Sequence, residues 1–139
     1  MKINGLKANS QNNKRERKPI SVIIVDPHPV FRRTLNKMIR DRIPEAYIFE
    51  ADDFDRAHAI IRNQSPDIFF LDITIFPKNG IEYIRTLKNE LPETVIVVLT
   101  THDSAEHETA VLTYGADYFF SKTDSSILNL VNTIEKIFL

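Results

Sequence analysis

The sequence contains no cysteine and no tryptophan, and only three of its 139 residues are glycine. The absence of cysteine excludes a disulfide scaffold and cysteine-ligated zinc sites. Gly5, Gly80 and Gly115 are too far apart to form a glycine-rich phosphate loop or a dinucleotide fingerprint. No apolar run approaches the roughly 18–20 residues of a membrane span, and no apolar run follows the N-terminal lysines as it would in a secretory signal. We therefore expect a cytoplasmic protein.

The formal net charge of −1 conceals an uneven distribution of charge along the chain. Residues 1–19 carry six basic side chains and one acidic side chain, a local charge of +5, which leaves −6 for residues 20–139. The first segment is rich in Lys, Asn and Gln and has little apolar surface to bury. We interpret residues 1–19 as a basic disordered tail and residues 20–139 as one folded domain. A basic arm that binds nucleic acid or an acidic surface is the alternative.

Apolar runs and helical periodicities alternate along residues 20–139. Short runs rich in β-branched and aromatic residues predict buried strands at 20–25, 46–50, 67–71, 94–99 and 117–121. Apolar residues at helical spacing predict helices at 29–43, 54–63, 80–91, 105–114 and 127–137. Residues 73–79 are predicted to form a loop. Five strand–helix repeats predict an α/β domain, (βα)5, with a doubly wound parallel five-stranded sheet.

Four polar residues stand at the predicted carboxyl ends of strands, the edge where open parallel sheets bind ligands. They are Asp26, Asp72, Thr100 and Lys122. Each alone has an ordinary structural explanation, because aspartates cap helices and lysines are usually solvated. Together they predict a site in which two carboxylates attract Mg²⁺ and one of them forms an aspartyl phosphate. The hydroxyl and the ammonium would hold the phosphoryl oxygens.

The histidines give no comparable signal. No two of them are spaced i, i+4, so we interpret them as surface or capping residues rather than metal ligands; they are His28, His58, His102 and His107.

Several motifs in order resemble the receiver domain of bacterial response regulators, in particular the DNA-binding subfamily with a His-Pro pair after the first strand. The motifs are residues 23–32, 66–72, 98–100 and 115–122, and Gly80 lies eight residues after Asp72. The resemblance implies a flavodoxin-like receiver fold. It also implies that Asp72 accepts a phosphoryl group from a sensor histidine kinase or a phosphotransfer protein.

The same resemblance implies roles for the other residues. Asp26, Asp72 and the backbone carbonyl of Thr74 would hold Mg²⁺, Thr100 and Lys122 would contact the phosphoryl group, and Phe119 would be a switch aromatic. Such a domain is not an enzyme beyond its own phosphotransfer and dephosphorylation.

One departure from the family pattern concerns the metal. Receiver domains carry two adjacent carboxylates after the first strand, whereas here Pro27 follows Asp26. We therefore expect weak Mg²⁺ binding. The alternative is a pseudo-receiver that binds proteins without phosphorylation. No output domain is recognised after the last predicted helix, so the sequence leaves open whether the chain acts alone or is part of a longer protein. It also leaves a homodimer open, and it predicts no nucleic-acid contact through the receiver domain and no membrane contact.

Overall fold

The computed structural model describes residues 19–75, 80–101, 104–122 and 127–138. These residues contain one five-stranded sheet with every neighbouring pair parallel, in the order β2-β1-β3-β4-β5. The strands are β1 (Ser21–Val25), β2 (Tyr47–Ala51), β3 (Ile68–Leu71), β4 (Val95–Thr100) and β5 (Tyr118–Ser121). The predicted doubly wound α/β fold is confirmed.

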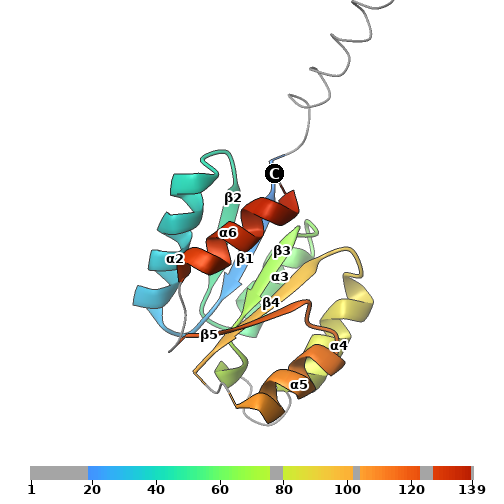
Figure 1. Cartoon of the computed structure of the whole chain (residues 1–139). Coiled ribbons are helices and arrows are strands. Elements are labelled where there is room, and N and C mark those ends of the chain that lie inside the picture. Colours follow the sequence, from blue (N-terminus) through green and yellow to red (C-terminus); the bar gives the residue numbers. More distant parts are fainter. Residues whose placement is uncertain (1–18, 76–79, 102–103, 123–126, 139) are drawn as a thin grey trace, which may run out of the picture.

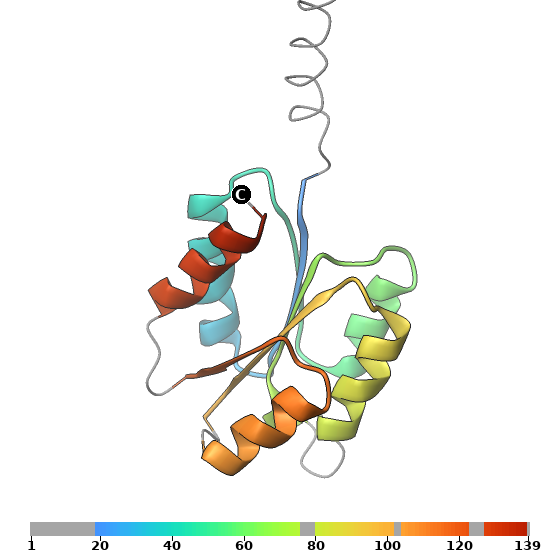
Figure 2. The same ribbon diagram turned by 45° about the vertical axis from the view of Figure 1, so that its right-hand side comes forward.

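Helices cover both faces of the sheet (Figures 1 and 2). The helices are α2 (Pro29–Arg42), α3 (Phe54–Ile61), α4 (Gly80–Glu90), α5 (Ala105–Thr113) and α6 (Ile127–Phe138). Helices α2 and α6 lie on one face, and α3, α4 and α5 lie on the other. None of the helices in the described part of the chain combines the length and the apolar character needed to cross a bilayer.

The three central strands are almost wholly buried, which explains their continuous apolar sequences. Phe69 and Phe70 illustrate the two-sided core, because they are fully buried and belong to clusters on opposite faces of the sheet. Burying one such side chain contributes about 1.5–3 kcal/mol. The strands therefore form a stable platform, and only their ends are available for polar chemistry.

A glycine caps the end of α5. Gly115 has a φ of 122° and follows the end of α5. Its amide donates to the carbonyl of Leu112, and the amide of Ala116 donates to the carbonyl of Val111. This pair of hydrogen bonds is a Schellman motif, and it directs the chain from α5 into β5.

Some predicted boundaries differ from the structure. The predicted loop at 73–79 begins with a 3₁₀ helix, η1 (Ile73–Ile75), because the backbone and hydroxyl of Thr74 turn back to the carboxylate of Asp72. Residues 76–79 lie outside the described part. Thr100 is the last residue of β4 rather than the residue after it, and α3 ends at Ile61. Residues 1–18 also lie outside the described part, so the boundary of the tail stays a prediction.

Candidate functional site

The topology brings the four predicted strand-end residues to one edge of the sheet. Asp26 follows β1, Asp72 follows β3, Thr100 ends β4 and Lys122 follows β5. Backbone hydrogen bonds fix their register: the amide of Asp72 donates to the carbonyl of Val25 at 3.0 Å, and the amide of Lys122 donates to that of Thr100 at 2.8 Å. The side chains of Asp26, Asp72 and Lys122 meet near the point where the strand order reverses, between β1 and β3.

Lys122 bridges the two carboxylates. Its Nζ lies 2.6 Å from Oδ2 of Asp26 and 2.7 Å from Oδ2 of Asp72. The three side chains are almost inaccessible, with exposures of 7% for Lys122, 2% for Asp26 and 1% for Asp72. The ring of Phe31 lies 4.3 Å from the ammonium and offers it a cation–π contact. Two negative charges share one positive charge in a region of reduced dielectric, so the cluster favours a further cation.

Asp72 is held in one orientation by Thr74. The amide and the hydroxyl of Thr74 donate to Oδ1 of Asp72 at 2.9 and 2.7 Å. Oδ2 is therefore the oxygen turned towards Lys122. The two oxygens of Asp72 therefore differ in their partners, since Oδ1 accepts from Thr74 and Oδ2 accepts from Lys122 at 2.7 Å.

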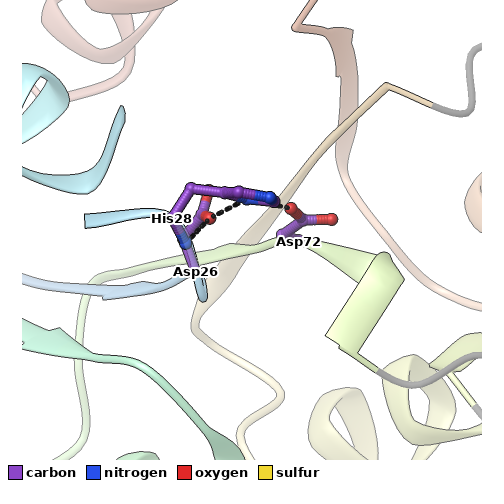
Figure 3. A group of neighbouring side chains, drawn as sticks. All are labelled: Asp26, His28 and Asp72. Carbon is purple, nitrogen blue, oxygen red and sulfur yellow. Dashed lines mark hydrogen bonds and ion pairs between the residues drawn. The ribbon is translucent and has the colours of Figure 1, made fainter. Parts of the chain in front are cut away.

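His28 is the residue whose contacts with the two carboxylates the sequence did not predict. It stands at the N-cap of α2 and its side chain is 63% exposed, which fits the expected surface or capping position. Its Nδ1, however, lies 3.0 Å from Oδ1 of Asp26 and 3.7 Å from Oδ2 of Asp72 (Figure 3). Its amide also donates to Oδ1 of Asp26 at 2.8 Å. The one available signal was its spacing, two residues after Asp26 and directly before a helix.

The other histidines have no such neighbours. His58 is half-buried rather than on the surface, and its Nε2 lies 2.9 Å from the hydroxyl of Tyr83. Burial raises the pKa of Tyr83 above its usual value, so this hydroxyl stays protonated. His107 is exposed, as expected, and His102 lies outside the described part.

Arg32 is a second residue that the sequence analysis missed. Its Nη1 donates to the carbonyl oxygen of Asp26 at 2.6 Å, and its Nε donates to Glu50 of β2 at 2.8 Å. Asn36 donates to the other carboxylate oxygen of Glu50. This network fastens the end of β1 to α2 and β2, and so fixes the position of Asp26.

The remaining predicted residues occupy different depths. Thr100 is fully buried at the end of β4. Phe119 is half-buried and packs against the core on the side of α3, α4 and α5. Pro27 is exposed and provides no polar side-chain atom.

The donor set fits a divalent cation, but only part of it suits Mg²⁺. One ligand atom from each of Asp26, His28 and Asp72 can be chosen so that all three lie within 4.8 Å of one another. The two carboxylates are the oxygen ligands that Mg²⁺ prefers. The imidazole nitrogen is a ligand typical of transition metals, and position 27 adds no third carboxylate.

The protein families and solved structures that resemble this chain agree on one family. The family model of the response regulator receiver domain matches residues 22–135. A solved two-component response regulator of the LuxR family from Aurantimonas superposes with a TM-score of 0.73 at 28% identity, and the match covers 86% of this chain and 84% of that one.

Two relatives that match this chain by sequence are transcriptional regulatory proteins. The transcriptional regulatory protein MctR of Rhizobium johnstonii is 31% identical over 88% of this chain and 56% of its own length. The transcriptional regulatory protein DegU of Brevibacillus brevis is 27% identical over 78% of this chain and 47% of its own length. The chain spans about half the length of the curated relatives that it matches.

Proposed function

Because the chain belongs to the family of response regulator receiver domains, we propose that it accepts a phosphoryl group on Asp72 in two-component signalling. The donor is a sensor histidine kinase or a phosphotransfer protein. The observation that carries the proposal is the setting of Asp72, whose Oδ1 is fixed by Thr74 while Oδ2 faces the ammonium of Lys122. A nucleophile and a cation are thus already aligned at the end of a rigid strand.

The transfer uses these groups in turn. Oδ2 of Asp72 attacks the phosphorus of a phosphohistidine, the P–N bond breaks, and its electron pair returns to the leaving imidazole. Lys122 moves from the carboxylates to the new phosphoryl oxygens, where a charge-assisted hydrogen bond is stronger. The hydroxyl of Thr100 donates to another phosphoryl oxygen. Asp26, Asp72 and the carbonyl of Thr74 would hold the divalent cation, Mg²⁺ in the proposal, which when bound would neutralise further negative charge.

The signal leaves the site through β4 and β5. Thr100 is buried at the end of β4, and Phe119 is half-buried on β5, so a shift of Thr100 towards the phosphoryl group opens space that Phe119 can fill. The surface formed by α5, β5 and α6 would then change for a partner protein. We propose that the protein acts in the cytoplasm, where sensor kinases use ATP. Its own catalytic role is limited to its phosphorylation and dephosphorylation.

Intact-mass measurement after incubation with acetyl phosphate and Mg²⁺ tests the assignment of Asp72. The wild type should gain one phosphate and Asp72→Asn should gain none. Asp67→Asn is the matched control, because Asp67 precedes the same strand at its opposite end, and this variant should be modified like the wild type. Modification of Asp72→Asn at the wild-type level would refute the assignment.

The pseudo-receiver alternative is favoured by one specific observation. Lys122 already contacts both carboxylates, and Pro27 withholds the additional carboxylate that would bind Mg²⁺ tightly. A domain whose carboxylates are already paired with a lysine can fold and bind partner proteins without a phosphoryl group. The absence of modification in both the wild type and Asp67→Asn, at saturating acetyl phosphate, would favour this function.

A further inference from the structure

We propose that Asp26, His28 and Asp72 bind a divalent transition-metal ion, such as Zn²⁺ or Co²⁺, in preference to Mg²⁺, with Nδ1 of His28 as a direct ligand. The inference deepens the proposed function, because it concerns the cation of the same site. It rests on the positions of the ligand atoms and does not require that phosphorylation occurs.

The distances between the ligand atoms suit a shared ion. Nδ1 of His28 lies 3.0 Å from Oδ1 of Asp26 and 3.7 Å from Oδ2 of Asp72. Adjacent ligands with bonds of about 2.1 Å are separated by about 3.0 Å around an octahedral ion and about 3.4 Å around a tetrahedral one. The two distances from Nδ1 thus lie within a few tenths of an ångström of the tetrahedral spacing, and all three ligand atoms lie within 4.8 Å of one another.

Asp26 has acceptor capacity in reserve. Its Oδ2 is buried, and its contact among the described residues is the ion pair with the ammonium of Lys122 at 2.6 Å. A carboxylate oxygen can accept more than one bond, so Oδ2 keeps room for a ligand bond beside that contact. The two carboxylates and Lys122 together carry a net charge of −1, so a cation adds favourably to the cluster.

The identity of the donors determines the preference. Mg²⁺ takes oxygen ligands almost exclusively, and Pro27 removes one oxygen donor from this edge of the sheet. An imidazole nitrogen strengthens the binding of Co²⁺, Ni²⁺ or Zn²⁺ far more than that of Mg²⁺. With Pro27 at the position of a carboxylate and the imidazole of His28 beside Asp26, the remaining donors favour a different kind of metal as well as a lower affinity for Mg²⁺.

The position of His28 also provides an entry path. Its side chain is 63% exposed, whereas Asp26 and Asp72 are almost inaccessible. An ion from solvent meets the imidazole first and then the two carboxylates behind it. Lys122, which follows β5, contacts the same two carboxylates through their Oδ2 atoms.

Titration calorimetry of the unphosphorylated full chain with Zn²⁺ and with Mg²⁺ tests the proposal, and the visible absorption of bound Co²⁺ reports on the ligands. The wild type should bind Zn²⁺ at least about 100-fold more tightly than Mg²⁺. His28→Ala should weaken Zn²⁺ binding by about tenfold or more, shift the Co²⁺ absorption, and change Mg²⁺ affinity by less than about twofold. His107→Ala, which removes another exposed histidine, should leave all three measurements unchanged.

Two results would overturn the proposal. One is an unchanged Zn²⁺ affinity and Co²⁺ spectrum in both His28→Ala and His28→Asn, with thermal melts that show folded proteins. The other is a wild type that binds Mg²⁺ as tightly as Zn²⁺. Because these measurements use unphosphorylated protein, a failure of labelling by acetyl phosphate would count against the proposed function alone.

Discussion

Aspartate and lysine occur at both edges of the sheet, but in different arrangements. At the edge where strands begin, Oδ2 of Asp67 accepts the amide of Ser21 at 2.8 Å, and Oδ2 of Asp117 accepts that of Ile96 at 2.8 Å. Lys88 pairs with Asp117 at 2.9 Å, and both side chains remain about one-third exposed. Each carboxylate here has a backbone donor from a neighbouring strand, and Asp117 has a lysine of its own.

At the opposite edge, Asp26 and Asp72 each use Oδ1 for a local hydrogen bond and turn Oδ2 to the same ammonium. These side chains are almost completely buried. Residue type and strand-end position therefore do not distinguish a binding site from a pair of residues that only stabilises the fold. The distinction lies in burial and sharing, because Lys88 and Asp117 at the first edge are about one-third exposed, whereas at the second edge two almost inaccessible carboxylates share one ammonium.

The largest expected effect comes from removing each lysine. Lys122→Met should lower the free energy of unfolding by about 3–5 kcal/mol, because two buried carboxylates lose their only described cation. Lys88→Met should cost about 1 kcal/mol or less, since Lys88 and Asp117 are partly solvated. Urea unfolding at neutral pH measures both. Equal losses would show that the two edges are electrostatically alike.

Substituting one aspartate at each edge should change the free energy of unfolding in opposite directions. Asp117→Ala should lower the free energy of unfolding by about 1–3 kcal/mol, because the amide of Ile96 loses its acceptor. Asp26→Asn should raise it by about 0.5–2 kcal/mol, because it removes the excess charge from a site built for binding rather than stability. The same urea titrations apply. Destabilisation by Asp26→Asn would contradict the proposed charge imbalance.

A carboxylate added at position 27 should increase the difference in cation binding between the two edges of the sheet. Pro27→Asp should tighten Mg²⁺ binding by about tenfold, because it adds an anionic oxygen ligand near Asp26. Titration calorimetry of the wild type and the variant measures the change, and Pro92→Asp, at an exposed position before β4 on the opposite edge, serves as a control for a general gain of negative charge. Equal affinities of the two proteins would mean that position 27 does not face the metal.

The smallest effect is expected from the N-terminal segment, which we still predict to be a tail outside the folded domain. Deleting residues 1–18 should change the free energy of unfolding by less than about 0.5 kcal/mol. Thermal melts of the two chains test this, and a drop of several degrees would refute it. Retention on heparin at low salt by the full chain alone would support the basic-arm alternative.

The sequence allowed the sheet and most of the site to be predicted, for a physical reason. Parallel strands bring their carboxyl ends to one edge, so the apolar runs before Asp26, Asp72 and Lys122 determine that these residues converge. His28 could not be placed in this way, because its contact with Asp26 depends on a side-chain rotamer at a helix cap. The 3₁₀ turn at residues 73–75 was missed because it depends on hydrogen bonds from Thr74 rather than on an apolar period.

The edge position of β5 has a consequence for motion. Within the described part of the chain, β5 pairs only with β4, and its four residues are all half-buried. Short edge strands open locally at a lower free energy than central ones, so the amides of β5 should exchange with solvent before those of β1 and β3. Because Lys122 follows β5, each opening also withdraws the ammonium from Asp26 and Asp72. Binding of an anion to Lys122 should therefore make β5 open less often. By the reciprocity of linkage, a partner that holds β5 closed should raise the affinity of Lys122 for that anion.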